Sequence, residues 1–202
     1  MEVIRLDPSK LQQAAMIYAR AFFDYPEFVS YLPSREWRTR HFTAYCEMGL
    51  NFALRYGEVY TTPDLKGIIA WFPPGKTHFA NWMYLKVPGF IRIMLLIGWK
   101  NASRITTCED YVAEVHEKIL PGPHWYLWGL AVDPDCQGQG LGTTVMQPGL
   151  TRADQQGLPV YLETHDEKNI AYYQKRGFDL VRSERVPGID LPFWCFVRQP
   201  KG

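Results

Sequence analysis

VDPDCQGQGLG, residues 132–142, is the stretch of sequence that decides the fold. It follows an apolar and aromatic run, WYLWGLAV at 125–132, and it precedes a segment with helical character. The pattern therefore predicts a strand, a glycine-rich turn and a helix in direct succession. Such a turn lies at the positive end of the helix dipole, where the first four helical N–H groups have no partner. Its three glycines carry no Cβ atoms to keep a diphosphate from these groups, so we expect a phosphate-bearing ligand here.

Three phosphate-binding motifs compete for the turn. A Walker A loop requires lysine after its last glycine, whereas Thr143 follows Gly142, which excludes this motif. A dinucleotide fingerprint requires G-x-G-x-x-G, whereas the turn has G-x-G-x-G. Glu163 does lie where a ribose-binding acid would be. Only about two further strands follow, however, which counts against a dinucleotide-binding fold. The third motif fits without adjustment. The turn resembles the acetyl-CoA loop of the GCN5-related N-acetyltransferases (GNAT), (Q/R)-x-x-G-x-(G/A), with Gln137, Gly140 and Gly142 at its defined positions.

A second motif strengthens this resemblance. YLETHDEKNIAYYQKRGF, residues 161–178, is similar to the later strand and helix of the superfamily, with Asn169, Tyr173 and the GF pair 177–178 in place. Asn169 and Tyr173 are four residues apart, so both side chains leave a helix on the same face. Within the superfamily, the closest pattern is that of the puromycin N-acetyltransferase group, which the chain resembles in FFDYP (22–26), VMQPGL (145–150), LPVYLET (158–164) and PFWCFVR (192–198).

The resemblance implies a direct transfer, in which acetyl-CoA and an amine bind together and the neutral amine attacks the thioester. It implies that Asn169 binds the pantetheine arm and that Tyr173, a catalytic residue, protonates the leaving thiolate. No metal ion is implied. The residues implied in binding acetyl-CoA are Leu130, Ala131, Val132, Gln137, Gly138, Gln139, Gly140, Leu141, Gly142, Thr143, Asn169 and Tyr173.

The base that takes the proton of the amine is a separate question, because either a carboxylate or an ordered water can serve. Glu163, at the end of the strand next to the cofactor strand, is the first candidate and the second expected catalytic residue. Asp24 and Glu27, in the loop between the first two helices, could instead hold the ammonium of the substrate. His116 and His124 are further candidates for the base.

Gly129 lies inside the predicted strand 125–132, where glycine is unfavourable unless a bulge or a close ligand uses the missing side chain. In the GNAT superfamily a bulge at this place splays two strands, and the pantetheine arm enters the gap. The alternative is that Gly129 makes room for a neighbouring aromatic side chain.

The remaining elements follow from periodicity and from turn residues. In chain order they are a strand at 3–6, helices at about 7–24 and 34–56, strands at 58–62 and 67–72, a helical block at 76–120, a strand at 124–132, a helix to about 156, a strand at 159–164, a short helix at 167–176, and strands at 178–186 and 191–198. This order belongs to the mixed α/β (α+β) class. The resemblance implies the GNAT fold, a mostly antiparallel sheet of about seven strands flanked by helices.

We expect one domain over residues 1–202, with a helical insertion at about 75–121 between the third and fourth strands. The insertion interrupts two strands that would otherwise follow closely, so it is a candidate for shaping the substrate site. FIRIMLLIGW at 90–99 is about half the length of a membrane span and contains Arg92, which favours a buried helix.

Charge and cysteine content narrow the partners and the compartment. The chain has 22 lysine and arginine residues against 21 acidic residues, without a basic run, so nucleic acid is not an expected partner. The four cysteines are widely spaced and have no zinc-like pattern, as in a cytoplasmic protein with reduced thiols. The segment MEVIRLDPSK lacks the features of a signal peptide, and no membrane partner is expected. A homodimer is common in this fold and is possible here, but no feature of the sequence indicates one.

The leading interpretation is an acetyl-CoA-dependent enzyme that acetylates the primary amine of a small molecule. A protein or peptide N-acetyltransferase is the near alternative, and a non-catalytic acyl-CoA sensor is the alternative from another class. Aromatic side chains that could stack on a planar substrate, or belong to the core, are Trp37, Tyr45, Trp71, Phe79, Trp82 and Tyr84.

Overall fold

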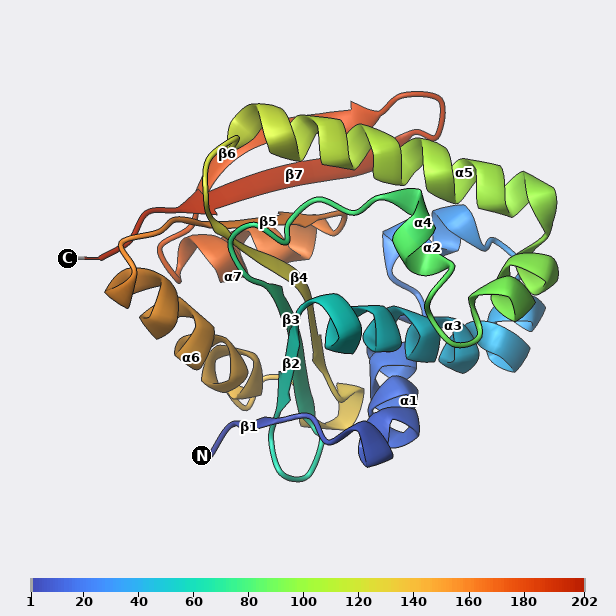
Figure 1. Ribbon diagram of the computed structural model, residues 1–202, viewed down its shortest axis with the longest axis horizontal. Coiled ribbons are helices and arrows are strands. Elements are labelled where there is room, and N and C mark those ends of the chain that lie inside the picture. Colours follow the sequence, from blue (N-terminus) through green and yellow to red (C-terminus); the bar gives the residue numbers. More distant parts are fainter. Residues whose placement is uncertain (1, 202) are drawn as a thin grey trace.

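A seven-stranded mixed sheet forms the centre of the computed structural model, which describes residues 2–201 (Figure 1). The strands are β1 (Ile4–Arg5), β2 (Glu58–Thr61), β3 (Gly67–Phe72), β4 (Trp125–Val132), β5 (Val160–Thr164), β6 (Asp179–Val186) and β7 (Leu191–Arg198). Their order in the sheet is β1-β2-β3-β4-β5-β7-β6. β4 and β5 are parallel, and all other neighbours are antiparallel. The predicted fold class, a mostly antiparallel sheet of about seven strands, is confirmed.

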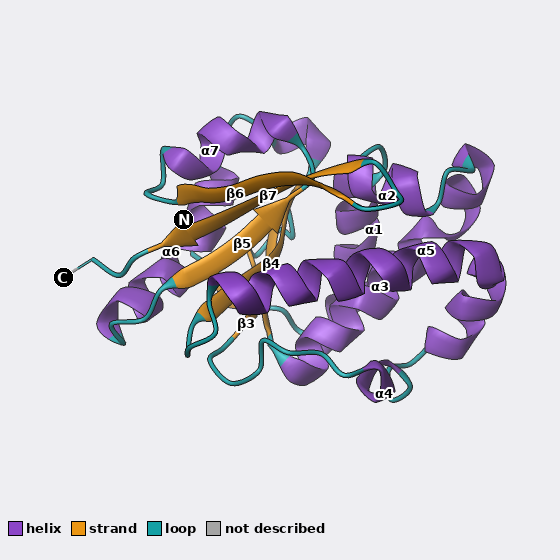
Figure 2. Ribbon diagram, turned by 90° about the horizontal axis from the view of Figure 1, so that it is seen from above, coloured by secondary structure: helices purple, strands orange, loops and turns teal. Residues whose placement is uncertain are grey.

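Helices cover both faces of this sheet, and each face has its own hydrophobic cluster. The helices are α1 (Leu11–Phe22), α2 (Pro26–Tyr31), α3 (Arg35–Tyr56), α4 (Asn81–Tyr84), α5 (Phe90–Ile119), α6 (Leu141–Gln155) and α7 (Ile170–Gln174). α6 and α7 lie on the side opposite α1, α2 and α3 (Figures 1 and 2). β3 lies between the two clusters and is buried at all six positions, as expected for a strand covered on both faces.

Capping residues mark the start of two N-terminal helical segments. The side chain of Asp7 accepts a hydrogen bond from the N–H of Ser9 and caps the 3-10 turn Pro8–Lys10, which leads into α1. The side chain of Ser34 accepts a hydrogen bond from the N–H of Trp37 at the start of α3. Pro26, which lies outside the two predicted N-terminal helices, occupies the first position of an additional helix, α2. Its fixed φ suits the first turn of a helix. As a result Glu27 lies on a helix rather than in a loop.

The insertion between β3 and β4 consists of α4 and the long helix α5. Residues 73–80 are not helical, so the helical part begins later than the expected residue 76. α5 contains a kink at Gly98, which has φ 74° and ψ 158°. The remainder of α5 lies close to β6 and carries side chains into the core.

The prediction that residues 90–99 form a buried helix is wrong for part of the segment. It is helical, but the exposed fractions of Ile91 and Trp99 are 66% and 88%. Ile93 and Ile97, which are four residues apart, are buried instead. A single helix covering a core buries only the stripe that repeats every three or four residues. In the part of the chain that the structure describes, no helix is long and apolar enough to cross a membrane.

β4 and β5 are paired over only a short distance. Trp125 lies opposite Val160 and Tyr126 lies opposite Tyr161, and no later pair of residues is in register. Both strands continue beyond this point, so they diverge toward their carboxyl ends. The backbone of β4 that follows is therefore not hydrogen-bonded to β5.

A bulge in β4 coincides with this divergence. Ala70 of β3 lies opposite Gly129, whereas the next residue, Trp71, lies opposite Leu127. Trp128 is therefore the extra residue of the bulge. The bulge predicted from a glycine within the strand is confirmed.

Gly129 also makes room for an aromatic neighbour, so both explanations of this glycine hold. A Cβ atom built on Gly129 would collide with the hydroxyl group of Tyr18 in α1. The glycine thus lets α1 pack closely on the strand at the bulge.

Candidate active site

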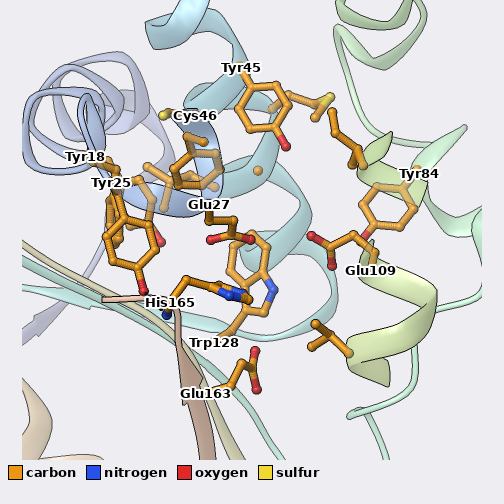
Figure 3. Close-up of a pocket in the computed structure, with 18 of the residues that line it drawn as sticks. Tyr18, Tyr25, Glu27, Tyr45, Cys46, Tyr84, Glu109, Trp128, Glu163 and His165 are labelled. Carbon is orange, nitrogen blue, oxygen red and sulfur yellow. Dashed lines mark hydrogen bonds between the residues drawn. The ribbon is translucent and has the colours of Figure 1, made fainter. Parts of the chain in front are cut away.

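A cavity of about 540 Å³ opens where β4 and β5 diverge (Figure 3). Much of its wall is aromatic, with rings from α1, α3, α4 and β4 that include Tyr18, Tyr45, Tyr84, Tyr126 and Trp128. The polar residues of the wall include Glu27, Glu109, Glu163, His165, Asn169 and Tyr173. The structure therefore brings both expected catalytic residues, Glu163 and Tyr173, to one cavity.

Glu163 lies on β5 and is held by Tyr126 of the neighbouring strand. The Tyr126 hydroxyl donates a hydrogen bond to Oε1 of Glu163, whereas Oε2 is buried and has no hydrogen-bond partner within residues 2–201. Burial raises the pKa of the Glu163 carboxyl to about 8, even though the bond from Tyr126 acts to lower it. A carboxylate with a pKa near the working pH and a free oxygen has the properties of a general base.

Asn169 and Tyr173 line the cavity from the same side, as their spacing predicts. The Asn169 amide donates to Oγ1 of Thr164 at 2.9 Å. Tyr173 is 7% exposed, and its ring packs between Phe178 and Phe196 with centroid distances of 5.8 and 5.7 Å. Burial raises the pKa of Tyr173 above its ordinary value, so its hydroxyl keeps its proton and can donate it.

The glycine-rich turn has the backbone that anion binding requires. Gly138 and Gly140 have φ of 79° and 81°, the left-handed region that glycine adopts readily. α6 begins directly after Gly140, which supplies no side-chain cap, and the first helical bond runs from the N–H of Thr144 to the carbonyl of Gly140. The N–H groups of residues 141–143 are therefore left for a ligand or water.

Gly142 also has a packing role. A Cβ atom at this position would meet the hydroxyl of Tyr172 on α7 and, at 3.5 Å, a methyl group of Val132. Gly142 thus allows α6 to pack against α7, while its N–H is one of those left for a ligand.

Replacing Gly140 by alanine should weaken both stability and acetyl-CoA binding. An alanine at positive φ costs about 1 kcal/mol, which lowers the melting temperature by about 2–4 °C in a protein of this size. Gly188, at φ 77° in the turn between β6 and β7, is the matched control, because neither glycine has an atom within 4 Å of its Cβ position. We expect a similar loss of melting temperature in both variants and a raised Kd for acetyl-CoA only in Gly140→Ala. Equal acetyl-CoA affinities would contradict a role of the turn in binding.

Arg176 is a candidate cofactor residue that the sequence analysis missed. Its Nε donates to Oγ1 of Thr143 at 3.0 Å, and its guanidinium lies over the ring of Tyr172, 3.4 Å from the centroid. Together with Lys175 and Lys201 it lines a second cavity beside the start of α6, also of about 540 Å³. Positive charge next to the turn favours the phosphates of a ligand. The signal was the basic pair immediately before the GF motif.

The other sequence candidates divide between the cavity and the rest of the molecule. Glu27 lines the cavity, whereas Asp24 forms ion pairs with Arg35 at 3.0 Å and Arg38 at 3.5 Å, outside it. Of the aromatic candidates, the cavity wall contains Tyr45, Trp82 and Tyr84 but not Trp37, Trp71 or Phe79.

The two histidine candidates do not reach the cavity wall. Their Nε2 atoms are 2.7 Å apart, and burial lowers the pKa of both His116 and His124. His165, which was not a candidate, does line the cavity. Its Nδ1 donates to the carbonyl of Pro192 at 2.7 Å, and burial lowers its pKa to about 4, so Nε2 is an uncharged acceptor.

Comparison with known proteins identifies the class of protein that this fold and site define. The model of the Acetyltransferase (GNAT) family matches residues 68–178, more than half of the chain, and the chain belongs to this family. An uncharacterized N-acetyltransferase of Schizosaccharomyces pombe is 25% identical over 210 residues, which cover 100% of this chain and 84% of that protein. The peptidyl-lysine N-acetyltransferase YjaB of Salmonella typhimurium is 29% identical over 75 residues, 37% of this chain and 49% of that protein.

Solved structures share the fold over nearly the whole chain. A structure described as histone acetyltransferase HPA2 and related acetyltransferase, from Corynebacterium glutamicum, has a TM-score of 0.68 at 16% identity and covers 99% of this chain and 96% of its own. The PaiA N-acetyltransferase of Thermoplasma acidophilum, in complex with coenzyme A, has a TM-score of 0.54 at 13% identity and covers 98% of both chains. The protein is thus an acyl-CoA-dependent N-acetyltransferase of a family that uses acetyl-CoA and acts on amines.

Proposed function

We propose that this enzyme transfers the acetyl group of acetyl-CoA to the primary amine of an apolar, aromatic small molecule within a ternary complex. The observation that carries the proposal is the aromatic cavity of about 540 Å³ with Glu163 in its wall. A volume of this order suits a drug-sized ligand, since such sites measure about 300–1,000 Å³. The sequence resemblance to puromycin N-acetyltransferases agrees with a substrate of this kind.

The insertion supports a small molecule over a peptide chain. Tyr84 and Glu109, from α4 and α5, form part of the cavity wall opposite the sheet. We propose that residues 1–202 form a single acetyltransferase domain in which the insertion at about 75–121 encloses the acceptor. A peptide substrate would instead need an open groove that admits an extended chain.

The residues around the two cavities suit acetyl-CoA, which would supply the activated acetyl group. The N–H groups of the turn and the guanidinium of Arg176 would hold the diphosphate. Leu130 and the following residues of β4 present backbone that β5 does not pair, so it can hydrogen-bond to the amides of the pantetheine arm. Asn169 would orient that arm from the other wall.

Glu163 and Tyr173 perform the two proton transfers in this proposal. Oε2 of Glu163 accepts a proton from the ammonium of the acceptor, directly or through a water, while Tyr126 holds Oε1 in place. The freed amine then attacks the thioester carbonyl carbon. The hydroxyl of Tyr173 gives its proton to the departing sulfur. The apolar wall excludes water and so limits hydrolysis of the thioester.

Release of the CoA thiol from acetyl-CoA tests this function. The acceptor panel contains puromycin, arylalkylamines, polyamines, aminoglycosides, a lysine peptide and a peptide with a free N-terminus. We expect release with the aromatic amines, at kcat/KM at least tenfold above the values for both peptides. Preference for a peptide would favour the protein or peptide N-acetyltransferase. Tight acetyl-CoA binding without release for any amine would favour an acyl-CoA sensor.

A further inference from the structure

Two glutamates from distant parts of the chain meet in the acceptor cavity, away from the candidate base. Glu27 comes from α2 and Glu109 from α5 in the insertion, and their carboxylates point toward one another in Figure 3. The Tyr31 hydroxyl donates to Oε1 of Glu109 at 3.4 Å, and it also lies near enough to Glu27 to act on the pKa of that carboxyl. The three side chains thus form one cluster, which we call the Glu27–Glu109 pair.

Nothing in the cavity wall offsets the negative charge of this pair. No lysine or arginine lines the cavity in residues 2–201. His165 does line it, but burial lowers the pKa of His165 to about 4, so it adds no positive charge at neutral pH. Asp24, three residues before Glu27, is by contrast neutralised by two arginines. The pair therefore has no cation beside it in the cavity wall.

The surrounding protein disfavours charge on both carboxylates. The side chain of Glu109 is exposed to solvent, but the protein around its carboxyl removes part of the water that would stabilise the charge. This desolvation raises the pKa of Glu109, and the charge of Glu27 raises it further. Burial likewise raises the pKa of Glu27. The titratable groups near the pair include Tyr18 of α1, Tyr31 of α2, Tyr45 of α3, Tyr84 of α4, Cys108 and Asp110 of α5, Tyr126 of β4 and Glu163 of β5, and none of these is a cation. A bound cation would relieve this repulsion.

Aromatic rings around the pair suit an organic cation. In Figure 3 Tyr45 lies above the two carboxylates, Tyr84 lies beside Glu109, and Trp128 is close to both glutamates. An ammonium group close to such rings gains from the negative potential of their faces. An apolar body joined to the ammonium would fill the rest of the aromatic cavity.

Glu163 forms a second anionic position in the same cavity. In Figure 3 it lies apart from the Glu27–Glu109 pair, beyond Trp128 and His165. Its Oε2 is an independent sign of a ligand, because this atom is buried without a hydrogen-bond partner in the described chain. One cavity therefore offers two places for positively charged nitrogen.

We propose that the acceptor has two cationic nitrogens on an apolar or aromatic body, one held by the Glu27–Glu109 pair while the other, the amine to be acetylated, lies at Glu163. The inference rests on the proposed function and narrows its substrate class to hydrophobic diamines. The Glu27–Glu109 pair acts as a specificity determinant that selects the acceptor and sets its direction in the cavity.

A matched pair of acceptors tests this inference. 1,4-Bis(aminomethyl)benzene carries two ammonium groups, and 4-methylbenzylamine replaces one of them by a methyl group of similar reach. We expect kcat/KM for CoA thiol release to be at least tenfold higher with the diamine. The ratio should fall toward one in the Glu27→Gln/Glu109→Gln variant, because the neutral amides no longer attract the second ammonium. Glu117→Gln changes the same charge on an exposed part of α5, outside the cavity wall, and should keep the wild-type ratio.

Binding provides a measurement that does not depend on turnover. Because the surroundings raise the pKa of both carboxyls, the empty pair favours protonation, and binding of the second ammonium should favour the release of a proton. Calorimetric titration of the diamine into the CoA-loaded enzyme, in buffers of different ionisation enthalpy, should detect the release in the wild type and not in the double variant. If the double variant does not fold, the single Glu109→Gln variant serves, since solvent already reaches this side chain.

The outcomes separate this inference from the proposed function. Diamine binding with proton release but without thiol release would support the second cation site and contradict the proposed transfer. Equal kcat/KM for the two amines in the wild type would support the transfer and overturn the second cation site. A diamine preference that survives in the glutamine variants would also overturn it, as would the absence of any diamine binding to the CoA-loaded enzyme.

Discussion

Replacing Glu163 by glutamine should lower kcat/KM for the acceptor amine by about 10²–10⁴-fold, the usual contribution of a general base. Glutamine keeps the shape of the side chain and can still accept a hydrogen bond from the hydroxyl of Tyr126, but it cannot take a proton from the amine. The affinity for acetyl-CoA should change little. Steady-state kinetics together with a direct measurement of acetyl-CoA binding would check both parts of this result.

The pH profile distinguishes a base from a residue that only supports the fold. Since the pKa of Glu163 is about 8, the fraction of the active carboxylate rises with pH through that value, and kcat/KM should rise with it. Glu163→Gln should lose this limb when the same amine is used throughout. Tyr126→Phe removes a hydrogen bond that lowers the pKa of Glu163, so the limb should move to higher pH. An unchanged profile in Glu163→Gln would place the base elsewhere, with His165 as the next group in the cavity.

The same substitution should have the opposite effect on stability. The pKa of Glu163 is raised in the folded state, so the native protein binds more protons than the unfolded chain between about pH 4.5 and about pH 8, and this carboxyl lowers stability as pH rises through that window. Glu163→Gln removes this loss of stability, because glutamine does not ionise. Its melting temperature should exceed that of the wild type at pH 9 and match it near pH 4, with about 2–4 °C for each kcal/mol relieved.

The second large effect is expected for Tyr173→Phe, which should lower kcat by about 10²-fold with little change in the Kd of acetyl-CoA. The substitution removes a buried hydroxyl from the cavity wall and leaves the ring between Phe178 and Phe196. Rapid-quench measurement of the acetylated amine would show whether the chemical step itself slows. Burial raises the pKa of Tyr173, so the defect should persist across neutral pH.

Tyr172→Phe is the matched control for this variant. The hydroxyl of Tyr172 faces Gly142 on α6, and the residue is not part of the wall of the acceptor cavity. Its kcat should stay within about twofold of the wild-type value, well below the effect of losing a general acid. Similar losses in the two variants would mean that α7 matters for packing and that Tyr173 is not the proton donor.

Two motifs in the sequence predicted the fold, and both rest on local chemistry. A glycine-rich turn between a strand and a helix exposes backbone N–H groups wherever it occurs, and residues 132–142 do so here. The hairpin of β2 and β3 and the caps at Asp7 and Ser34 are local in the same sense. Gly129 predicted the bulge because a strand interior disfavours glycine.

Other features depended on contacts that no short segment contains. Gly142 belongs to a contiguous turn, yet the atom nearest its Cβ position, the hydroxyl of Tyr172, comes from a helix 30 residues later, so its packing role was not predicted. The exposed side of residues 90–99 was not predicted, because hydrophobicity alone does not say which side of a helix meets the core.

The sequence by itself thus determined the family, the fold class and the seven strands, since these follow from contiguous motifs and from local periodicity. The tertiary structure alone decided the character of the acceptor site. Glu27, Glu109 and Glu163 are far apart in the chain, and only the packing of α2 and α5 against the diverging strands brings their carboxylates into one aromatic cavity. Burial in that cavity then shifts the pKa of each, a property of the surroundings that the residue type does not carry.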